Sequence, residues 1–516
     1  LYSHHATDPC SGRLVNAWDL VRLHKYGDKD DNFDADTPVS KLPSFKAMTE
    51  YAAQDQAVTN LMAQERYNAA EDIFANAVAA QPISGDWMAD AKLETDRNGA
   101  IKPTIENVRI ILERDPELAG KFALNKFANR GEVLGPLPWN NSSKRRLWSD
   151  TDNNGVYWHM ERKYGITRRG NIDSALDLHA QIHAFNEVQD YLDSLTWDNV
   201  PRLETLFTDY LGAENTPYNR AVCRKTFIAA VARAMTPGCK YDTMTILHGP
   251  QGIGKSTLLD RMSHGWFNDT IRTFNGKEGS ELLQGVWLVE VAELEAFRNS
   301  EVNEIKSFLT RRFDRFRPAY GRHVTELPRC CVFFGTTNNS EFLRDNTGNR
   351  RFWPVDVGIV PHEKTVWNDL TSDVIDQLWA EARVYWALSE ELILPEEVQA
   401  AALEKQEEHR EVSPREGLIH GFVEKKVPAD WPKWSISQRR DWWCGATRGE
   451  EGELVERDRI CALEVWCELF GKDKADMKNT DTREINGVLS RLPGWDRRTV
   501  RYGNEYETQR GFKKMQ

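Results

Sequence analysis

Hydrophobic and polar positions along the chain divide it into segments of different periodicity. From about residue 41 to 200, apolar residues recur with mostly helical spacing, interrupted by loops such as "RGEVLGPLPWNNSS". From about 201 to 385, β-branched and aromatic runs (Thr243 to Leu247, Val286 to Val291, Cys331 to Gly335) alternate with helical stretches. The first segment is therefore predicted to be a mainly helical region, and the second an α/β domain with helices on both faces of its sheet.

The two ends of the chain show other patterns. Residues 1–40 are polar, and "DKDDNFDADTP" is typical of an acidic linker. Residues 386–454 predict a helical linker, in which a charged helix runs into a break at Pro414. Residues 455–516 follow the order helix, helix, strand-like segment, which predicts a winged-helix-like domain. In such a domain the basic side chains would contact DNA phosphates; these are Arg497, Arg498, Arg501 and Arg510. A small domain that only packs on the neighbouring domain fits the pattern equally well.

Composition narrows the functional classes. The 516 residues suffice for roughly three or four domains. A formal net charge of -12 excludes a uniformly basic surface, but a DNA motor can keep its positive charge local. No apolar run reaches the roughly 18 residues of a membrane span, so we expect a soluble protein without a membrane partner. The eight cysteines contain no CxxC pair, which favours the reducing cytosol.

The segment "ILHGPQGIGKSTLLDRM" matches the phosphate-binding pattern GxxxxGK[ST]. A predicted strand, "TMTIL", leads into it, and a predicted helix, "STLLDRM", follows it. In such a loop the backbone N–H groups surround phosphate oxygens, Lys255 reaches the β- and γ-phosphates, and the Ser256 hydroxyl ligates Mg²⁺. The sequence thus predicts ATP and Mg²⁺ as cofactors, bound by Gly249, Pro250, Gln251, Gly252, Ile253, Gly254, Lys255, Ser256 and Thr257.

Two later strand ends supply candidate catalytic groups. "GVWLVEVAELEAF" is an apolar strand that ends in acids. Glu293 is the candidate for polarising the attacking water, and Glu290 is the metal-side acid unless it is an ordinary salt-bridged glutamate. The strand "CCVFFGTTNNS" ends in Thr337 and Asn338, whose amide would hold the water and sense the γ-phosphate. An asparagine after a strand is often only a turn residue, but its place after the acids favours the functional interpretation.

Two basic segments complete the candidate chemistry. "DNTGNRRFWPV" carries Arg350 and Arg351, which would insert into the active site of a neighbouring subunit unless they bind acidic surfaces. Between the acids and the amide, residues 310–329 carry six arginines and predict a basic hairpin. The hairpin side chains that can bind phosphates and stack on bases would contact single-stranded DNA; these are Arg317, Tyr320, Arg322 and His323. The alternative is a hairpin that is exposed to solvent and binds nothing.

These motifs in this order resemble the virulence-associated E family of phage and mobile-island replication proteins. The resemblance is carried by "WDNVPRLETLFTDYLG", "GPQGIGKST", "GVWLVEVAEL", "FFGTTN" and "GNRRFWPV", and it covers roughly residues 85 to 390. The family is related to superfamily 3 helicases, so the resemblance implies an AAA+-like P-loop ATPase core. The segment "SHHATDPCSGRLVNAWDLVRLHKYG" is similar to one that often joins an upstream primase-like domain, which we therefore expect before residue 1.

The resemblance also implies a mechanism. It implies a hexameric ring that hydrolyses ATP at subunit interfaces while it translocates on single-stranded or forked DNA and unwinds it. Lys255 and Ser256 would be the Walker A pair, Glu290 and Glu293 the Walker B acids, and Asn338 sensor 1. Arg351, or else Arg350, would be the finger in trans, and Arg322 with His323 the tip of the pore hairpin. Ala292 departs from the usual paired acids, which leaves the roles of the two glutamates open.

Two other functions are compatible with the loop alone. A non-motor ATP switch that oligomerises is the main alternative, and a metabolite kinase is the third. Two groups of histidines are set aside as ordinary residues. His179 and His183 are spaced i, i+4 as in a zinc-protease helix, but no third ligand is evident. His4, His5 and Cys10 lack a second ligand pair.

The predicted hairpin separates a motor from the alternatives. Replacing Arg322→Ala together with His323→Ala should abolish DNA stimulation of ATP hydrolysis and leave nucleotide binding intact, because these side chains would contact only DNA. Steady-state hydrolysis with and without single-stranded DNA, and unwinding of a forked duplex, measure the effect. Normal unwinding by the double variant would show that the hairpin does not track DNA.

Overall fold

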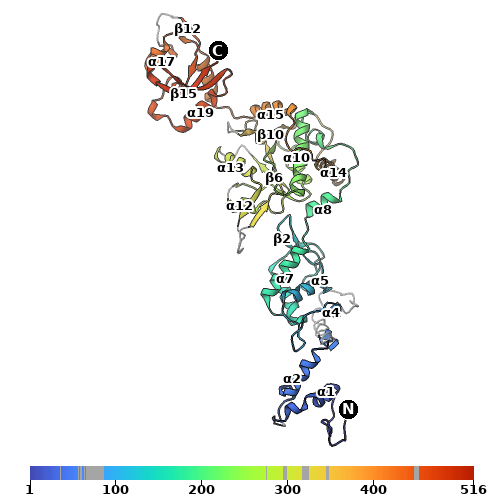
Figure 1. Cartoon of the computed structure of the whole chain (residues 1–516). Helices are drawn as coiled ribbons and strands as arrows, with labels where there is room; N and C mark the ends of the chain where they lie inside the picture. Colours follow the sequence, from blue (N-terminus) through green and yellow to red (C-terminus); the bar gives the residue numbers. More distant parts are fainter. Residues whose placement is uncertain are drawn as a thin grey trace. The chain divides into compact units, whose positions relative to one another are not determined.

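The structure is a computed structural model whose described residues form two compact units. It describes residues 1–34, 36–55, 57–58, 61–62, 64–65, 87–272, 274, 276–293, 299–316, 325–343, 348–446 and 453–515. One unit comprises residues 1–195 with 284–286, and the other comprises 196–283 with 287–516. Figure 1 shows the elements of both units in sequence colours.

The first unit is mainly helical. Near its start, α1 (Ala17–Tyr26) packs on α2 (Pro43–Ala52), and Arg22 Nη1 donates to Ser44 Oγ over 2.6 Å. Thr104 caps the amphipathic α5 by accepting from the Asn107 N–H. The remaining helices are α4 (Trp87–Asp90), α5 (Ile105–Arg114), α6 (Asp150–His159), α7 (Arg169–Ile182) and α8 (Glu187–Ser194).

A small antiparallel sheet also belongs to this unit. Its strands are β1 (Phe122–Asn125), β2 (Arg130–Val133) and β3 (Arg146–Leu147), in the order β1-β2-β3. Residues 130–133 belong to the segment "RGEVLGPLPWNNSS", which its sequence pattern predicted to be a loop. For these four residues, which form β2, the prediction is wrong. A four-residue strand is too short to show a clear period-two pattern. Its last residue, Val133, enters the same core as Ile111 and Leu176.

The second unit is built on a five-stranded sheet in the order β10-β4-β9-β6-β5. All four strand pairs are parallel. The predicted α/β class is therefore confirmed, and the sheet is parallel. The strands are β4 (Met244–His248), β5 (Phe267–Asn268), β6 (Leu288–Ala292), β9 (Val332–Thr337) and β10 (Phe352–Asp356).

Helices cover both faces of this sheet. Neighbouring residues of β9 point to opposite faces. Phe334 packs on Phe227 of α10 (Pro217–Met235), with ring centroids 5.8 Å apart. Phe333 packs on Phe308 of α13 (Asn299–Leu309), with centroids 5.7 Å apart. The other helices of this part are α9 (Leu206–Leu211), α11 (Lys255–Met262), α12 (Gly276–Glu281), α14 (Ser372–Ala387) and α15 (Glu396–Glu408).

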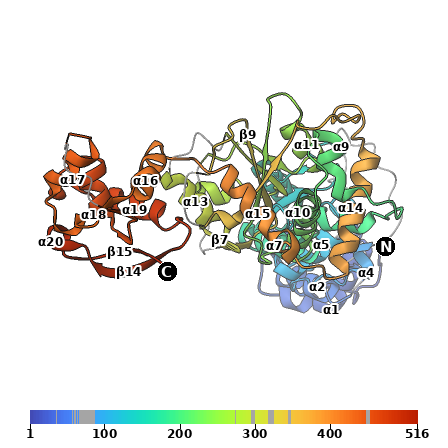
Figure 2. The same cartoon turned by 90° about the horizontal axis from the view of Figure 1, so that it is seen from above.

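The core of the second unit is anchored by two buried indoles. Trp287, just before β6, stacks on Trp379 of α14 with ring centroids 4.0 Å apart. Each indole N–H donates to a backbone carbonyl, Trp287 to Ala230 and Trp379 to Met262. Because both polar tips are satisfied, the rings are buried without an unpaired donor. In Figure 2, α10 lies between α14 and α15, and both helices contact it.

Residues after α15 form a separate hydrophobic core. Three antiparallel strands have the order β13-β15-β14, and β14 pairs with β15 along its whole length. The core includes Ile419, Phe422 and Val423, so it begins upstream of the boundary predicted at residue 455. Its elements are α16 (Pro414–Glu424), β11 (Val427–Pro428), α17 (Ile436–Trp443), β12 (Leu454–Val455), β13 (Arg459–Ile460), α18 (Ala462–Glu464), α19 (Asn479–Leu489), β14 (Trp495–Arg501), α20 (Gly503–Tyr506) and β15 (Thr508–Lys514).

The predicted basic hairpin is described only at its two flanks. Strands β7 (Phe313–Phe316) and β8 (Thr325–Pro328) pair antiparallel, from Phe313 opposite Pro328 to Phe316 opposite Thr325. Arg317, Tyr320, Arg322 and His323 lie outside the described residues. Among the helices that the structure describes, none has both the length and the apolar character needed to cross a membrane.

Candidate functional site

The candidate site lies where three neighbouring strands of the parallel sheet end. In the β4–β9 pair, the last residue of β4, His248, is opposite Thr337. In the β6–β9 pair, the last residue of β6, Ala292, is opposite Thr336. Because parallel strands end at the same edge, the loop after β4, the acids of β6 and the amide after β9 come together. The order also makes this a switch point, since the chain continues from β4 to the far edge strand β5 and returns.

The loop between β4 and α11 requires glycine at two positions for different reasons. A Cβ on Gly249 would lie 2.2 Å from the carbonyl oxygen of Val357, so no larger residue fits without moving the backbone. Gly254 has a φ of 97°, which is unfavourable for other residues, and it immediately precedes the first turn of α11. Its Cβ would also approach a methyl of Val366 to 3.1 Å. The loop can therefore keep its N–H groups and the helix N-terminus directed at one point.

Lys255, the first residue of α11, is buried at this point. Its ammonium donates to the carbonyl oxygens of Gly249 (2.6 Å) and Pro250 (2.9 Å). It also donates to Oδ1 of Asn338 over 2.8 Å, across 83 residues of sequence. An ammonium group at this position carries the positive charge that an anionic phosphate ligand requires. The contact brings the predicted Lys255 and Asn338 into one site.

Glu290 occupies the centre of a second network in this site. Its side chain is 1% exposed, and its Oε1 accepts hydrogen bonds from Ser256 (2.7 Å) and Thr336 (2.5 Å). Its Oε2 is buried without a hydrogen-bond partner. An unpaired carboxylate oxygen costs free energy in a buried site, and it is a preferred ligand of Mg²⁺. Ser256 and Glu290 are therefore hydrogen-bonded to each other beside an unpaired carboxylate oxygen, and their joint binding of one ion stays a prediction.

Glu293 lies just past the end of β6 in a strained backbone conformation. Its φ is 54°, and its N–H donates to the Thr336 carbonyl over 3.0 Å. A residue with a Cβ seldom adopts a left-handed φ unless its surroundings impose it, and such residues cluster at functional sites. Its side chain is exposed and lines the same hollow as Glu290. The two glutamates therefore differ physically, because one is buried and hydrogen-bonded and the other faces solvent.

The loop, the acids and the amide surround a hollow of about 280 Å³. Its wall also contains Trp367, whose side chain is 49% exposed and which no sequence motif indicated. A flat aromatic face at the rim can stack on a purine base. The lining residues are Gln251, Gly252, Gly254, Lys255, Ser256, Thr257, Glu290, Ala292, Glu293, Thr336, Thr337, Asn338 and Trp367.

A charged network adjoins the loop on the side of β10. Asp356, the last residue of β10, contacts His248 Nδ1 (2.7 Å), His409 Nε2 (2.9 Å) and Lys405 Nζ (3.0 Å). Burial opposes ionisation of Asp356, but its hydrogen bonds to these three cations or imidazoles hold its pKa below the usual range. Burial also opposes protonation of His409, yet Asp356 and the Ser340 carbonyl outweigh it and raise the pKa of His409. Sequence spacing gave no sign of this network.

The arginine pair directly precedes β10, at the end of that strand opposite to Asp356. Arg350 and Arg351 lie in the short helix η6 (Asn349–Arg351). Arg350 is exposed, whereas Arg351 is half-buried and its Nε lies 3.9 Å from Asp242 of the same chain. Arg350 is therefore the more accessible of the two to a neighbouring molecule. Neither arginine is among the described residues that line the hollow of the same chain.

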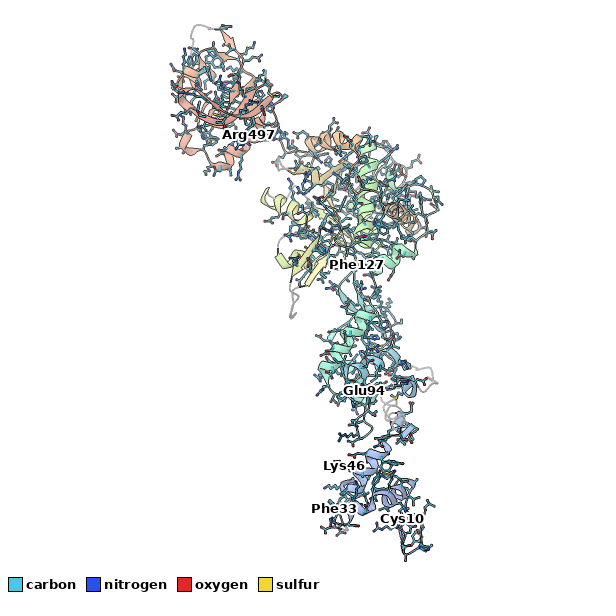
Figure 3. The ribbon with its side chains drawn as sticks, in the orientation of Figure 1. Cys10, Phe33, Lys46, Glu94, Phe127 and Arg497 are labelled. Atoms are coloured by element: carbon cyan, nitrogen blue, oxygen red, sulfur yellow. The ribbon has the colours of Figure 1, made fainter. Side chains whose placement is uncertain are left out.

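The C-terminal arginines all lie on the exposed β14–β15 pair. Arg497, Arg498, Arg501 and Arg510 are exposed, and Figure 3 labels Arg497 on this pair. The register places Thr499 opposite Arg510, so Arg510 shares a face with Arg497 and Arg501. Arg498 points to the other face and pairs with Asp496 over 3.2 Å. Three of the four predicted phosphate contacts are thus grouped and one is not.

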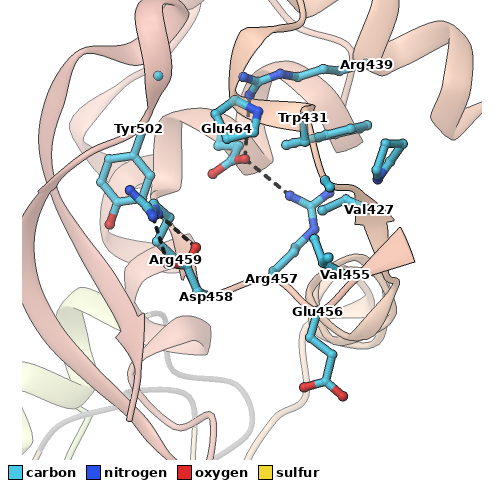
Figure 4. A pocket seen from close by; sticks show the side chains of 14 residues that line it. Val427, Trp431, Arg439, Val455, Glu456, Arg457, Asp458, Arg459, Glu464 and Tyr502 are labelled. Carbon is cyan, nitrogen blue, oxygen red and sulfur yellow. Dashed lines mark hydrogen bonds and ion pairs between the residues drawn. The ribbon is translucent and has the colours of Figure 1, made fainter. Parts of the chain in front are cut away.

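A second hollow, of about 260 Å³, lies in the C-terminal core (Figure 4). Its wall contains Arg457, whose Nη1 lies 3.2 Å from Glu464 and whose guanidinium lies 4.2 Å from the ring centroid of Phe422. Arg439 pairs with Glu468 over 2.7 Å. Burial, and then the neighbouring Glu464, raise the pKa of Glu468 to about 7. These buried charges compensate one another, so we assign this cluster to the domain core.

The network at Asp356 should make stability depend on pH in a defined direction. His409 has a raised pKa in the folded protein, so its ion pair stabilises fully below the ordinary pKa of 6.5. That contribution is lost as the pH rises through the raised value. The melting temperature lost in His409→Gln should therefore be larger at about pH 6 than at about pH 8.5. Exposed His362→Gln serves as the control, and a loss that grows with pH would contradict the ion pair.

Comparison with known proteins finds a family model that matches the part of the chain containing this site. Residues 192–411 match the virulence-associated protein E-like domain, and no curated protein sequence matches the chain. Among solved structures, the A form apo structure of the NrS-1 C-terminal region (305–718) has a TM-score of 0.42 at 10% identity, covering 80% of this chain and 100% of that one. An apo structure of the same region has a TM-score of 0.38 at 11% identity, covering 76% and 95%. The chain therefore carries a virulence-associated protein E-like domain, which contains every residue of the candidate site.

Proposed function

We propose that the chain is an ATP-driven helicase that acts in the replication of a phage or mobile genetic element, in the cytosol of a bacterial host. The observation that carries the proposal is the meeting of Lys255, Asn338, Ser256 and Glu290 at the carboxyl edge of one parallel sheet. A cation, a hydroxyl–carboxylate pair and an amide at a helix N-terminus are the groups that a nucleoside triphosphate with Mg²⁺ requires. The family match is compatible with this role.

Each group has a defined task toward ATP. The loop N–H groups and the N-terminus of α11 hold the phosphate oxygens, and Lys255 exchanges its carbonyl contacts for the β- and γ-phosphates. The unpaired Oε2 of Glu290 and the Ser256 hydroxyl would hold Mg²⁺, which would supply positive charge next to the phosphates. Trp367 stacks on the base at the rim.

Hydrolysis needs a positioned water, and two groups face the place where it would attack. Glu293 is exposed to the hollow and accepts hydrogen bonds only, so it can orient the water and draw on its proton. Asn338 can donate to or accept from the water once Lys255 moves to the phosphates. The buried Glu290 is already engaged by two hydroxyls, so we assign the water to Glu293 and the metal to Glu290.

An arginine from a neighbouring subunit completes the site. The described residues that line the hollow include one lysine and no arginine, and phosphoryl transfer is accelerated by an added guanidinium. Arg350, exposed at the start of β10, fits this role better than Arg351, which is held near Asp242. Hydrolysis at subunit interfaces then requires a ring, and we propose a homohexamer.

DNA would be bound at two places. The proposed pore contact is the basic hairpin between β7 and β8, and the second contact is the β14–β15 face with Arg497, Arg501 and Arg510. Single-stranded or forked DNA is the proposed substrate, with an upstream primase domain as a partner. The alternative, an oligomerising ATP switch, would use the same nucleotide site but would not unwind DNA.

The variant Lys255→Ala should abolish both ATP hydrolysis and unwinding of a forked duplex, because the phosphates lose the buried cation among the described residues that line the hollow. Exposed Lys364→Ala, which removes a lysine paired with Asp209, should keep both activities. Hydrolysis by the wild type without any unwinding would favour the switch over the helicase.

Removal of the exposed arginine tests whether the active site is shared between subunits. Arg350→Ala should bind ATP but lose turnover by about 10³-fold or more. Mixing it with Lys255→Ala should restore part of the turnover, because an intact arginine then meets an intact loop at some interfaces. The identical mixture with Arg351→Ala shows which arginine acts. An absence of recovery in every mixture would contradict a site shared between subunits.

A further inference from the structure

The first unit contains a cluster of potential metal ligands that is independent of the nucleotide site. His179 lies in the last turn of α7, and His183 follows the helix as its C-cap. The structure brings Glu113 of α5 to both of them, 66 and 70 residues away in sequence. The i, i+4 histidine pair lacked a third ligand in the sequence, and packing of α5 on α7 supplies it.

The geometry of the three side chains matches a shared ion. Oε2 of Glu113 lies 3.4 Å from Nδ1 of His179 and 2.8 Å from Nε2 of His183. The two imidazole centroids are 4.4 Å apart, and the three potential ligand atoms lie within 4.8 Å of one another. Ligands at about 2.1 Å from a tetrahedral zinc ion are about 3.4 Å apart. Small side-chain movements would therefore close the cluster around an ion.

A buried imidazole whose nitrogens make no hydrogen bond is the independent sign of a ligand. His179 is 1% exposed, and neither of its ring nitrogens makes a hydrogen bond. An unpaired buried polar group of this kind costs about 1–3 kcal/mol, and coordination to an ion would satisfy one nitrogen.

The nearby cation of Arg109 is engaged by another carboxylate. Arg109, one turn before Glu113 on α5, donates to Glu106 over 2.8 and 3.0 Å instead. A comparable cluster in the same unit, Asp115 with His159, differs in this respect, because Tyr164 donates to Asp115 and Lys163 pairs with the adjacent Glu117. Within the described part of the chain, the hydrogen bond and the ion pairs of the Glu113 carboxylate are thus made with imidazoles.

We propose that Glu113, His179 and His183 bind a divalent transition-metal ion, with zinc as the chemically matched ion. Two neutral nitrogens and one carboxylate oxygen form a ligand set that suits Zn²⁺ and excludes the oxygen-preferring Mg²⁺ and Ca²⁺. Glu113 and His183 are 42% and 38% exposed, so the ion would be reached from solvent. Because its ligands come from α5 and α7, the ion would crosslink these two helices and stabilise the unit.

Zinc stoichiometry tests the site in the full chain. The protein is stripped with a chelator, reloaded with Zn²⁺, dialysed and analysed by inductively coupled plasma mass spectrometry. Glu113→Gln and His183→Ala should each bind one zinc ion fewer than the wild type. The matched controls Glu106→Gln, on the same helix, and His420→Ala, which is 37% exposed on α16, should bind as many as the wild type. Equal stoichiometry in the wild type and both ligand variants would overturn the proposal.

Cobalt substitution tests the ligand positions by a spectroscopic signal that a replacement ligand should change in a defined way. Co²⁺ bound to the wild type should give the intense visible bands of low-coordinate cobalt, and these bands should vanish in His183→Ala. His183→Cys keeps a ligand at the position, so it should restore binding and add a sulfur-to-cobalt charge-transfer band in the near ultraviolet. A cysteine variant that binds cobalt without this band would place the ion elsewhere and contradict the site. Circular dichroism confirms that each variant is folded.

Discussion

The carboxylate of Glu290 is almost completely buried, and a buried charge is stable only where other groups compensate for it. Ser256 at the start of α11 and Thr336 near the end of β9 both donate to its Oε1. These contacts connect the glycine-rich loop, β6 and β9 at the edge where parallel strands end. The remaining oxygen has no hydrogen-bond partner, which makes the compensation incomplete and leaves a place for a cation. The chemistry of the whole site depends on this arrangement.

At the same edge of the sheet, side-chain contacts connect the glycine-rich loop to residues that follow the last strand, β10. His248 directly precedes Gly249 and contacts Asp356, which in turn contacts Lys405 and His409 beyond it. Movement of the loop on nucleotide binding would change the surroundings of His248. The network therefore provides a physical connection between the loop and α15 that needs no direct contact between them.

The central part of the site could be predicted because its information is local. A strand, a glycine-rich loop and a helix follow one another in residues 244–262, and the acids and the amide each follow an apolar run of their own. Parallel pairing then brings those strand ends together. Trp367, Asp356 and the approach of Glu113 to His179 could not be predicted, because each depends on packing between distant segments. The four-residue β2 was missed because so short a strand carries little periodicity.

The central claim is that Mg·ATP binds between the loop and the end of β9. Hydrogen–deuterium exchange of the full chain, followed by mass spectrometry, localises binding directly. On addition of Mg·ATP we predict slower exchange in residues 249–257 and 336–338, because phosphates and Mg²⁺ would engage these backbone and side-chain groups. Exchange in the C-terminal core around Arg457 should not change. Unchanged exchange in both segments at saturating nucleotide, or protection confined to the C-terminal hollow, would contradict the account.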